Sequence, residues 1–346
     1  MYAVTLREYG EEENLQYETG IPEPQPKPNQ VLVEVKASSV NPIDLMKRAG
    51  YGKTIFEKQR NDLFPWIIGS DFSGNVVDKG SKVSNFEIGD EVWGCSSNAN
   101  SGTHAQYVCI DMDEITHKPK NIDHLSASSL PYVALTTWSA IVRWAGLRPI
   151  DLEGKKVFIQ GGAGGVGCFS IQLFKSLGCE VATTCGEKNI DLVRSLGANQ
   201  TINYHEEDFF NVLEDFDIVY DLHGDNVLEN SLDKCCKILK NNKESHYITL
   251  THPFVNTIDS KGLLMGVPHA LFLRHQLKRK YDPINVHWSI YRPSLSGLEQ
   301  LTDLVNENTI KPVVDSVYSL NDLPEAHKKL ATGHVSGKIV IDHKND

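Results

Sequence analysis

The sequence predicts an α/β protein in which a β-rich domain precedes a doubly wound parallel sheet. Three observations lead to this prediction. Short strand patterns separated by turn signals dominate residues 1–125, strand and helix patterns alternate from about residue 126, and a glycine-rich turn at 161–167 joins a strand to a helix. With 346 residues, the chain is long enough for two domains that each bury a core.

The first predicted domain, residues 1–125, consists of short strands. A proline-rich connector at 21–28 precedes one of them, and Gly89-Asp90 supplies a turn signal before another. Strands are expected at 1–6, Val31–Ala37, Asp71–Val77, Glu91–Gly94 and Ala105–Ile110.

The second predicted domain, residues 126–285, alternates strands and helices, which is typical of a parallel sheet. Its first helix is expected at Leu130–Trp144. Strands are expected at Val157–Ile159, Glu180–Cys185, Gln200–Asn203, Asp217–Leu222 and His246–Leu250, and helices at Cys168–Leu177, Lys188–Leu196, Glu206–Leu213 and Val227–Leu239. Residues 286–346 are expected to add an edge strand to this sheet and to return to the first domain through Lys338–Ile341.

The glycine-rich turn is the most informative motif of the chain. Gly162, Ala163, Gly164, Gly165, Val166 and Gly167 fit the pattern Gly-x-Gly-x-x-Gly between an apolar strand and an amphipathic helix. Glycines there permit a tight turn and a close approach of the backbone to phosphates, while the helix N-terminus offers free N–H groups and the positive end of its dipole. The motif predicts dinucleotide binding; the alternative is a plain structural turn.

Composition narrows the possible partners. A net charge of −11 disfavours nucleic acid and anionic membranes as main partners. No run of about 18 apolar residues is present, so no membrane span is expected. The chain starts directly with a strand pattern, which leaves no room for a transit peptide, and its seven cysteines lack a disulfide framework. These features favour an intracellular, cytoplasmic protein.

Several further motifs resemble one enzyme family. They are Ser39-Val40-Asn41-Pro42-Ile43-Asp44, Gly50-Tyr51-Gly52, Gly69-Ser70-Asp71-Phe72-Ser73-Gly74, Gly89-Asp90-Glu91-Val92, Leu130-Pro131-Tyr132-Val133-Ala134-Leu135-Thr136 and Gly333-His334-Val335-Ser336-Gly337-Lys338. Together with the glycine turn they resemble the medium-chain dehydrogenase/reductase superfamily, in its zinc-free quinone-oxidoreductase branch. The resemblance covers essentially the whole chain. It implies a GroES-like domain, a Rossmann domain that binds NADP, hydride transfer in a cleft between them, a homodimer and a mitochondrial location.

The sequence departs from the zinc enzymes of this superfamily. Those carry an early ligand Cys and a Gly-His-Glu motif, whereas this chain has Asn41 and Asp44 in the first region and Gly69-Ser70-Asp71 in the second. Cys95 and Cys109 stand apart, so the four closely spaced cysteines of a structural zinc lobe are missing. No metal site is therefore predicted.

The resemblance assigns catalytic roles to Asn41, Asp44 and Tyr51. Asn41 lies near the nicotinamide and donates its amide N–H to a substrate oxygen, while Asp44 and Tyr51 face the same cleft. Tyr51 is a proton donor or a stacking surface in this reading. The alternatives are that Asn41 to Asp44 form a turn with Asp44 as a helix cap, and that Tyr51 is a loop aromatic that packs.

The end of the second Rossmann strand decides the cofactor. NAD enzymes usually place an Asp or Glu there, about 20 residues after the glycine turn, to bind the ribose hydroxyls. This chain has Gly186 in that region, and Lys188 supplies positive charge close by in the sequence. By resemblance to the family, Tyr204 matches a position beside the adenosine phosphate. NADPH is therefore predicted over NADH. Glu187 complicates the prediction, because a shift of one residue would make it the ribose acid.

Six more residues resemble cofactor contacts of the family. Thr136 is expected at the nicotinamide end, Leu250 at the nicotinamide ribose and Tyr291 in the segment that borders the nicotinamide, while His334, Val335 and Ser336 belong to the tail motif that returns to the cofactor. The alternatives are a buried helix hydroxyl, core packing and a tight turn before the last strand.

The predicted function is NADPH-dependent reduction of a quinone or an enone without zinc. Reduction of 2-enoyl thioesters is a second possibility, because Leu271–Lys280 carries four basic residues that a CoA-like carrier would favour; a solvated helix face is the better explanation of these residues. A third is an NADPH-binding scaffold or sensor with little turnover, since a fold alone does not fix a function.

Overall fold

The computed structural model describes residues 1–59, 64–96, 102–224 and 228–344, and the chain divides into two units. The first unit comprises Met1–Leu135 and Pro293–Asp346, and the second comprises Thr136–Arg292. The expected boundaries lay at 125 and 285. The observed division between Leu135 and Thr136 falls inside helix α4 (Pro131–Trp138), so no linker composition marks it.

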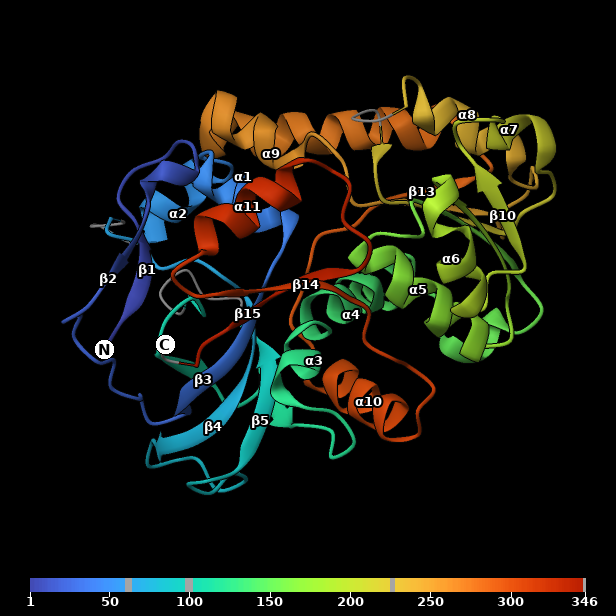
Figure 1. The fold of residues 1–346 in the computed structure, drawn as a ribbon. Coiled ribbons are helices and arrows are strands. Elements are labelled where there is room, and N and C mark those ends of the chain that lie inside the picture. Colours follow the sequence, from blue (N-terminus) through green and yellow to red (C-terminus); the bar gives the residue numbers. More distant parts are fainter. Residues whose placement is uncertain (60–63, 97–101, 225–227, 345–346) are drawn as a thin grey trace. The chain divides into compact units, whose positions relative to one another are not determined.

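A seven-stranded sheet forms the centre of the first unit (Figure 1). Its order is β14-β15-β3-β4-β5-β7, and β6 also pairs with β3. The strands are β3 (Gln30–Val40), β4 (Asp71–Lys79), β5 (Glu91–Cys95), β6 (Tyr107–Asp111), β7 (Ile115–His117), β14 (Val314–Ser319) and β15 (Lys338–Asp342). Pairing of β15 with β3, from Ile339 opposite Val40 to Asp342 opposite Ala37, confirms that the tail returns to the first domain.

The remaining elements of the first unit surround this sheet. They are the hairpin β1 (Ala3–Leu6) and β2 (Leu15–Glu18) and the helices α1 (Pro42–Arg48), α2 (Lys53–Gln59), α3 (His124–Ser128), α10 (Leu295–Asn306) and α11 (Leu323–Ala331). Val31, Val33, Phe72 and Val92 belong to a fully buried apolar cluster that fixes the inward faces of β3, β4 and β5. This core positions the carboxyl end of β3, from which the site described below is built.

The second unit contains a six-stranded parallel sheet with the order β10-β9-β8-β11-β12-β13. The strands are β8 (Lys156–Gln160), β9 (Glu180–Cys185), β10 (Gln200–Asn203), β11 (Ile218–Asp221), β12 (His246–Thr249) and β13 (Asn285–Trp288). From β8 the chain first adds β9 and β10 on one side and then β11, β12 and β13 on the other. The order therefore reverses between β8 and β11, and the expected doubly wound sheet is confirmed.

Helices connect these parallel strands. They are α5 (Gly165–Ser176), α6 (Ile190–Ser195), α7 (Phe209–Val212), α8 (Ser231–Ile238) and α9 (Phe254–Lys280), which is interrupted at Gly262 (Figure 1). None of the described helices combines the length and apolarity that crossing a bilayer requires.

Several expected elements differ in extent from those observed. The helix expected at Glu206–Leu213 shortens to α7, because the N–H groups of Glu206 and Glu207 both bond to the Asn203 oxygen in a turn. Asn230 has a φ of 56°, a left-handed conformation, so α8 begins only at Ser231; residue 227 of the expected helix lies outside the described residues. The helix expected from Leu130 continues from α4 as a π-helical segment, Ser139–Trp144.

Candidate active site and cofactor loop

The glycine turn has the expected strand–turn–helix context. It follows β8 and opens α5, whose first residue is Gly165. Gly161 has a φ of 91°, which favours glycine, and its N–H donates to Thr184 Oγ1 at 3.0 Å. The Gly162 N–H donates to the Thr184 oxygen at 2.9 Å. The neighbouring strand β9 therefore holds the start of the turn in place.

Two of the glycines are required by packing. A Cβ on Gly162 would lie 2.1 Å from Thr183 Oγ1, and one on Gly167 would lie 2.3 Å from the Gly161 oxygen. A Cβ on Gly164 would meet no other atom nearer than the Gly161 oxygen, at 3.8 Å. The protein itself leaves room at Gly164, beside the helix N-terminus, as a pyrophosphate site requires. The intervening Ala163 is buried and Val166 is half-buried.

The end of β9 fits a cofactor that carries a 2′-phosphate. Gly186 follows the strand, and a Cβ added there would lie 3.3 Å from the Tyr204 hydroxyl. Tyr204 is 55% exposed, so its ring is available to a ligand. Lys188 and Glu187 are both exposed. The structure brings Gly186 and Tyr204 together.

Thr136 offers a second observation that points to a ligand. The side chain is buried, and its Oγ1 has no hydrogen-bond partner among the described residues. A buried hydroxyl without a partner is unusual and calls for an explanation.

Leu250 and Tyr291, the other two residues expected at the nicotinamide end, are both half-buried. Leu250 follows β12 and donates its N–H to the backbone oxygen of Asp221 at 3.3 Å, and Tyr291 lies beyond the end of β13.

Asp221 organises the carboxyl end of β11. Its Oδ1 accepts the N–H groups of His223, at 3.1 Å, and Gly224, at 2.8 Å. Its Oδ2 accepts the hydroxyls of Ser231, at 2.8 Å, and Tyr247, at 2.7 Å. A buried carboxylate with four such donors fixes the loop that follows the strand.

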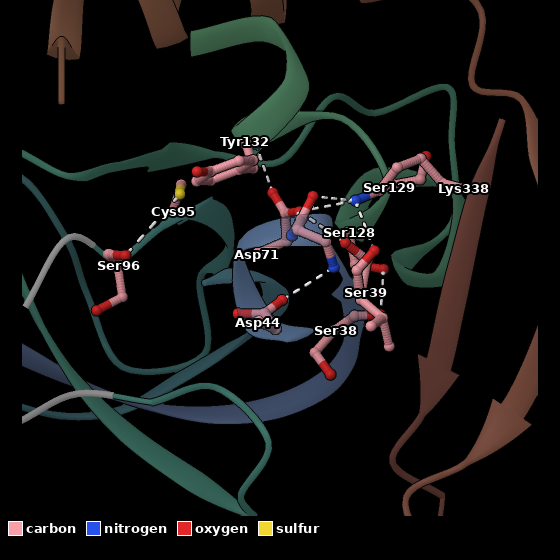
Figure 2. A network of polar contacts seen from close by, with 12 residues as sticks. Ser38, Ser39, Asp44, Asp71, Cys95, Ser96, Ser128, Ser129, Tyr132 and Lys338 are labelled. Carbon is pink, nitrogen blue, oxygen red and sulfur yellow. Dashed lines mark hydrogen bonds and ion pairs between the residues drawn. The ribbon is translucent and has the colours of Figure 1, made fainter. Parts of the chain in front are cut away.

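In the first unit, a buried polar cluster surrounds Asp71 (Figure 2). Asp71 Oδ2 accepts from Ser39 Oγ at 2.6 Å, from Asn41 Nδ2 at 2.9 Å and from Lys338 Nζ at 3.3 Å. Its Oδ1 accepts the backbone N–H of Tyr132 at 2.5 Å. Asp71 is fully buried, so these four donors replace the water that its charge would otherwise require.

Lys338 completes this cluster from the other end of the chain. Its ammonium contacts Asp71, donates to the Val40 oxygen at 3.2 Å and hydrogen-bonds Asn41 Oδ1. The Asn41 amide therefore accepts from an ammonium on one side and donates to a carboxylate on the other. Rotation of the amide by 180° would bring its N–H₂ against the ammonium, so the two charges fix its orientation.

Asp44 lies beside this cluster and is fully buried. Asn41 is the N-cap of α1, and its backbone N–H donates to Asp44 Oδ2 at 2.9 Å, so the alternative reading of Asp44 as a capping residue is supported. Asp44 Oδ1 has no hydrogen-bond partner among the described residues. Burial raises the pKa of this carboxyl, while the positive charge of Lys47 acts in the opposite direction.

Tyr51 follows α1 in a turn between Gly50 and Gly52, whose φ angles are 92° and 80°. It is half-buried, and its N–H donates to the Met46 oxygen at 2.9 Å.

The tail motif forms the turn before β15: His334 is exposed, Val335 packs against the apolar core, and the Ser336 N–H donates to Asp315 at 3.1 Å. These contacts hold the turn in place.

The sequence-based reasoning missed four residues of these sites. Asp71 and Lys338 stood within motifs used for the family resemblance but received no role, and Ser39 and Asp221 received none either. The available signal was an ionisable residue directly beside a motif glycine for Lys338, and an ionisable residue at the end of a parallel strand for Asp221.

Comparisons with known proteins assign the chain to a protein family. Residues 27–120 match the family model described as alcohol dehydrogenase GroES-like domain, and residues 196–341 match the one described as zinc-binding dehydrogenase. The NAD(P)H oxidoreductase RTN4IP1, mitochondrial, of Danio rerio is 36% identical over 332 residues, which cover 92% of this chain and 85% of that protein. The chain belongs to the medium-chain dehydrogenase/reductase superfamily.

Within this superfamily, the protein of the same name from Homo sapiens is 35% identical over 356 residues, covering 99% of this chain and 89% of that protein. A quinone oxidoreductase from Coxiella burnetii has a similar structure, with a TM-score of 0.81, 31% identity and 99% of both chains covered. The family and the pairing of a GroES-like domain with a parallel-sheet domain are thus confirmed. The relatives named NAD(P)H oxidoreductase and the quinone oxidoreductase neighbour identify this chain as an oxidoreductase of the NAD(P)H-linked class.

One of the matching family models has zinc in its description. Within the part of the chain that the structure describes, no group of three His, Cys, Asp or Glu side chains is arranged to hold a metal ion. In the cluster around Asp71, the carboxylate is already in contact with the Lys338 ammonium.

Proposed function

We propose that the protein is an NADPH-dependent oxidoreductase that reduces quinones or activated alkenes without zinc. The observation that carries this proposal is the glycine loop, in which packing requires Gly162 and Gly167 while Gly164 keeps open space beside the N-terminus of α5. Relatives named NAD(P)H oxidoreductase and a structural neighbour named quinone oxidoreductase support the same reading.

The second unit would hold the cofactor through its own residues. Gly164, Gly165 and Val166 would bind the pyrophosphate, and Gly186, Lys188 and Tyr204 would surround the 2′-phosphate, where no carboxylate other than the exposed Glu187 follows β9. Thr136, Leu250 and Tyr291 would border the nicotinamide end, and His334, Val335 and Ser336 are proposed as further contacts. When bound, NADPH supplies a hydride to the substrate.

The first unit would supply the polar groups that the reduction needs. Asn41 keeps one N–H on Asp71 and would offer the other to the substrate oxygen, where negative charge develops. Asp44, whose pKa burial raises, and Tyr51 are the proposed sources of the proton. An ammonium already bound to Asp71 disfavours a dication at the same carboxylate, which supports a zinc-independent reaction.

The remaining assignments follow the relatives. We propose a mitochondrial location, because the relatives carry that word in their names, and a homodimer as in the family resemblance. A small-molecule quinone or enone is the proposed partner, in preference to nucleic acid.

An NADPH-oxidation assay across quinones, alkenals and 2-enoyl thioesters tests the proposal. We expect turnover with quinones or enones. Preferential turnover of enoyl thioesters would favour the second candidate, a thioester reductase, whose CoA-like carrier would suit the basic last turn of α9. Tight NADPH binding with no turnover of any substrate would refute both enzymatic readings and favour a scaffold or sensor.

A further inference from the structure

His223 lies at the point where the order of the parallel sheet reverses. The glycine loop follows β8, and His223 is the second residue after β11, the neighbouring strand on the other side of the reversal. In open α/β sheets, ligands bind at the carboxyl ends of the strands at this reversal. Position alone therefore places His223 beside a ligand site.

The imidazole of His223 packs directly on the glycine loop. A Cβ on Gly161 would lie 2.2 Å from His223 Nε2 and 2.6 Å from Cδ2. Gly161 also has a left-handed φ of 91°, so both the backbone conformation and the ring above it require glycine at this position. The first residue of the loop is thus shaped around this histidine.

The backbone of His223 is held before any ligand binds. Asp221 Oδ1 accepts its N–H, and Asp221 is itself fixed by Ser231 and Tyr247. A Cβ on the next residue, Gly224, would lie 2.8 Å from the Thr251 side chain, so the loop also packs against the segment after β12. A ring on such a support is pre-organised for contact with a ligand.

The ring itself retains its hydrogen-bonding capacity. It is half-buried, and its nitrogens form no hydrogen bond with any residue that the structure describes. Burial lowers the pKa of His223, and the carboxylate of Asp221 acts against this shift. Asp221 is the charged group from β11 that faces the ring; residues 161–167 of the loop carry no ionisable side chain, and Thr251 is uncharged.

We propose that the His223 imidazole is a cofactor-binding group that contacts NADPH beside the glycine loop and takes up a proton when the cofactor binds. The inference rests on the proposed function, because it takes the dinucleotide as the ligand of that loop. The phosphates of the cofactor bring negative charge to the crevice, and negative charge favours the imidazolium. By linkage, NADPH binds more tightly as the pH falls from the pKa of His223 in the complex toward its pKa in the free protein.

Histidine ring signals in the NMR spectrum test this proposal without measuring activity. The protein, labelled in its histidines, is titrated over roughly pH 5 to 8 with and without saturating NADPH. The His223 signal is assigned from its loss in His223→Gln. We expect NADPH to raise the pKa of His223 by about one unit or more, which corresponds to an affinity gain of roughly tenfold across the titration range. His246 is the first residue of β12 and so lies at the amino end of a strand, away from the carboxyl ends where the cofactor is proposed to bind. Its signal serves as the internal reference, and its pKa should not change when NADPH is added.

The His223→Gln variant supplies the matching binding measurement. We expect it to keep the wild-type unfolding temperature, to bind NADPH several-fold more weakly near pH 6 and to gain less affinity than the wild type as the pH falls. If NADPH binds, and Gly164→Ala weakens that binding, while the His223 signal and the His223→Gln affinity stay unchanged, the inference is wrong and the proposed function stands. If the wild-type protein binds no NADPH, both the inference and the proposed function are refuted.

Discussion

The Lys338 ammonium lies 3.3 Å from the Asp71 carboxylate in a buried ion pair that joins β15, near the end of the chain, to β4. The Asn41 amide lies beside this ion pair and hydrogen-bonds both charged groups. The pair therefore does two things. It ties the tail of the chain into the sheet of the first unit, and it orients the amide proposed to act on the substrate.

Removal of one charge of this pair should destabilise the protein. In Lys338→Met, the Asp71 carboxylate remains buried without its ammonium, and we expect a loss of about 3–5 kcal/mol in the free energy of unfolding. The double variant Lys338→Met with Asp71→Asn removes both charges and should recover much of this loss. Urea unfolding measures both variants; a single variant as stable as the wild type would contradict the role given to the pair.

A charge-conserving swap separates the proposed donor role of Asn41 from its structural role. Asn41→Asp combined with Asp71→Asn keeps one carboxylate beside Lys338 and one amide in the cluster, but the side chain of residue 41 loses its two N–H groups. We expect a folded protein that binds NADPH normally and turns over roughly 100-fold more slowly. Steady-state kinetics provide the measurement. Wild-type turnover in the swapped variant would show that Asn41 only supports the fold.

Two glycine variants distinguish packing from cofactor binding. Gly164→Ala places a methyl group in open space, so the unfolding temperature should hold while the affinity for NADPH falls at least roughly tenfold. Gly162→Ala pushes its methyl group against Thr183 and should lose about 1–3 kcal/mol of stability. Fluorescence titration and thermal unfolding report the two effects. Unimpaired NADPH binding by Gly164→Ala would place the pyrophosphate elsewhere.

The choice between NADPH and NADH should depend on Gly186. Its φ of −77° and ψ of 159° accept any side chain, so a carboxylate can be introduced without backbone strain. Gly186→Asp should lower the preference for NADPH over NADH at least roughly tenfold by repelling the 2′-phosphate. Gly186→Asn, of equal size but uncharged, is the matched control and should keep most of the preference. Equal effects of the two substitutions would point to size rather than charge.

Acid should destabilise the first unit through two buried histidines. Ser38 Oγ contacts both His104 Nδ1, at 3.1 Å, and His343 Nε2, at 2.8 Å, and burial lowers the pKa of each ring to about 3. A lowered pKa means that the folded state resists protonation. The contribution of the two neutral rings to the free energy of unfolding is therefore complete above the unfolded pKa of about 6.5. It is lost as the pH falls toward about 3, at up to about 1.4 kcal/mol per pH unit for each ring.

The midpoint of urea unfolding at a series of pH values below neutrality checks this window. His343→Asn should flatten the pH dependence, whereas the same change at His269, which is exposed on α9, should not. Identical pH profiles of wild type and His343→Asn would remove the buried histidines from the explanation.

The second unit was predictable because its signals are local. The glycine turn stands next to the strand and helix that it joins, and the apolar runs of β8 and β9 are bounded by turn residues. The polar cluster was not predictable, because its partners lie far apart in the sequence; Lys338 and Asp71 are 267 residues apart. The strand expected at Val31–Ala37 continues to Val40, because Ser38 and Ser39 are buried partners of distant side chains.

The most direct test of the central claim follows the hydride itself. The purified protein, treated with a metal chelator, is given NADPH in which both hydrogens at C4 of the nicotinamide are replaced by deuterium, together with an enone, and the product is analysed by mass spectrometry. Direct, zinc-independent transfer predicts a saturated product that carries one deuterium from the cofactor, at the rate of the untreated enzyme. A product without deuterium would contradict direct transfer. Loss of product formation in the chelator-treated protein but not in the untreated protein would contradict zinc independence.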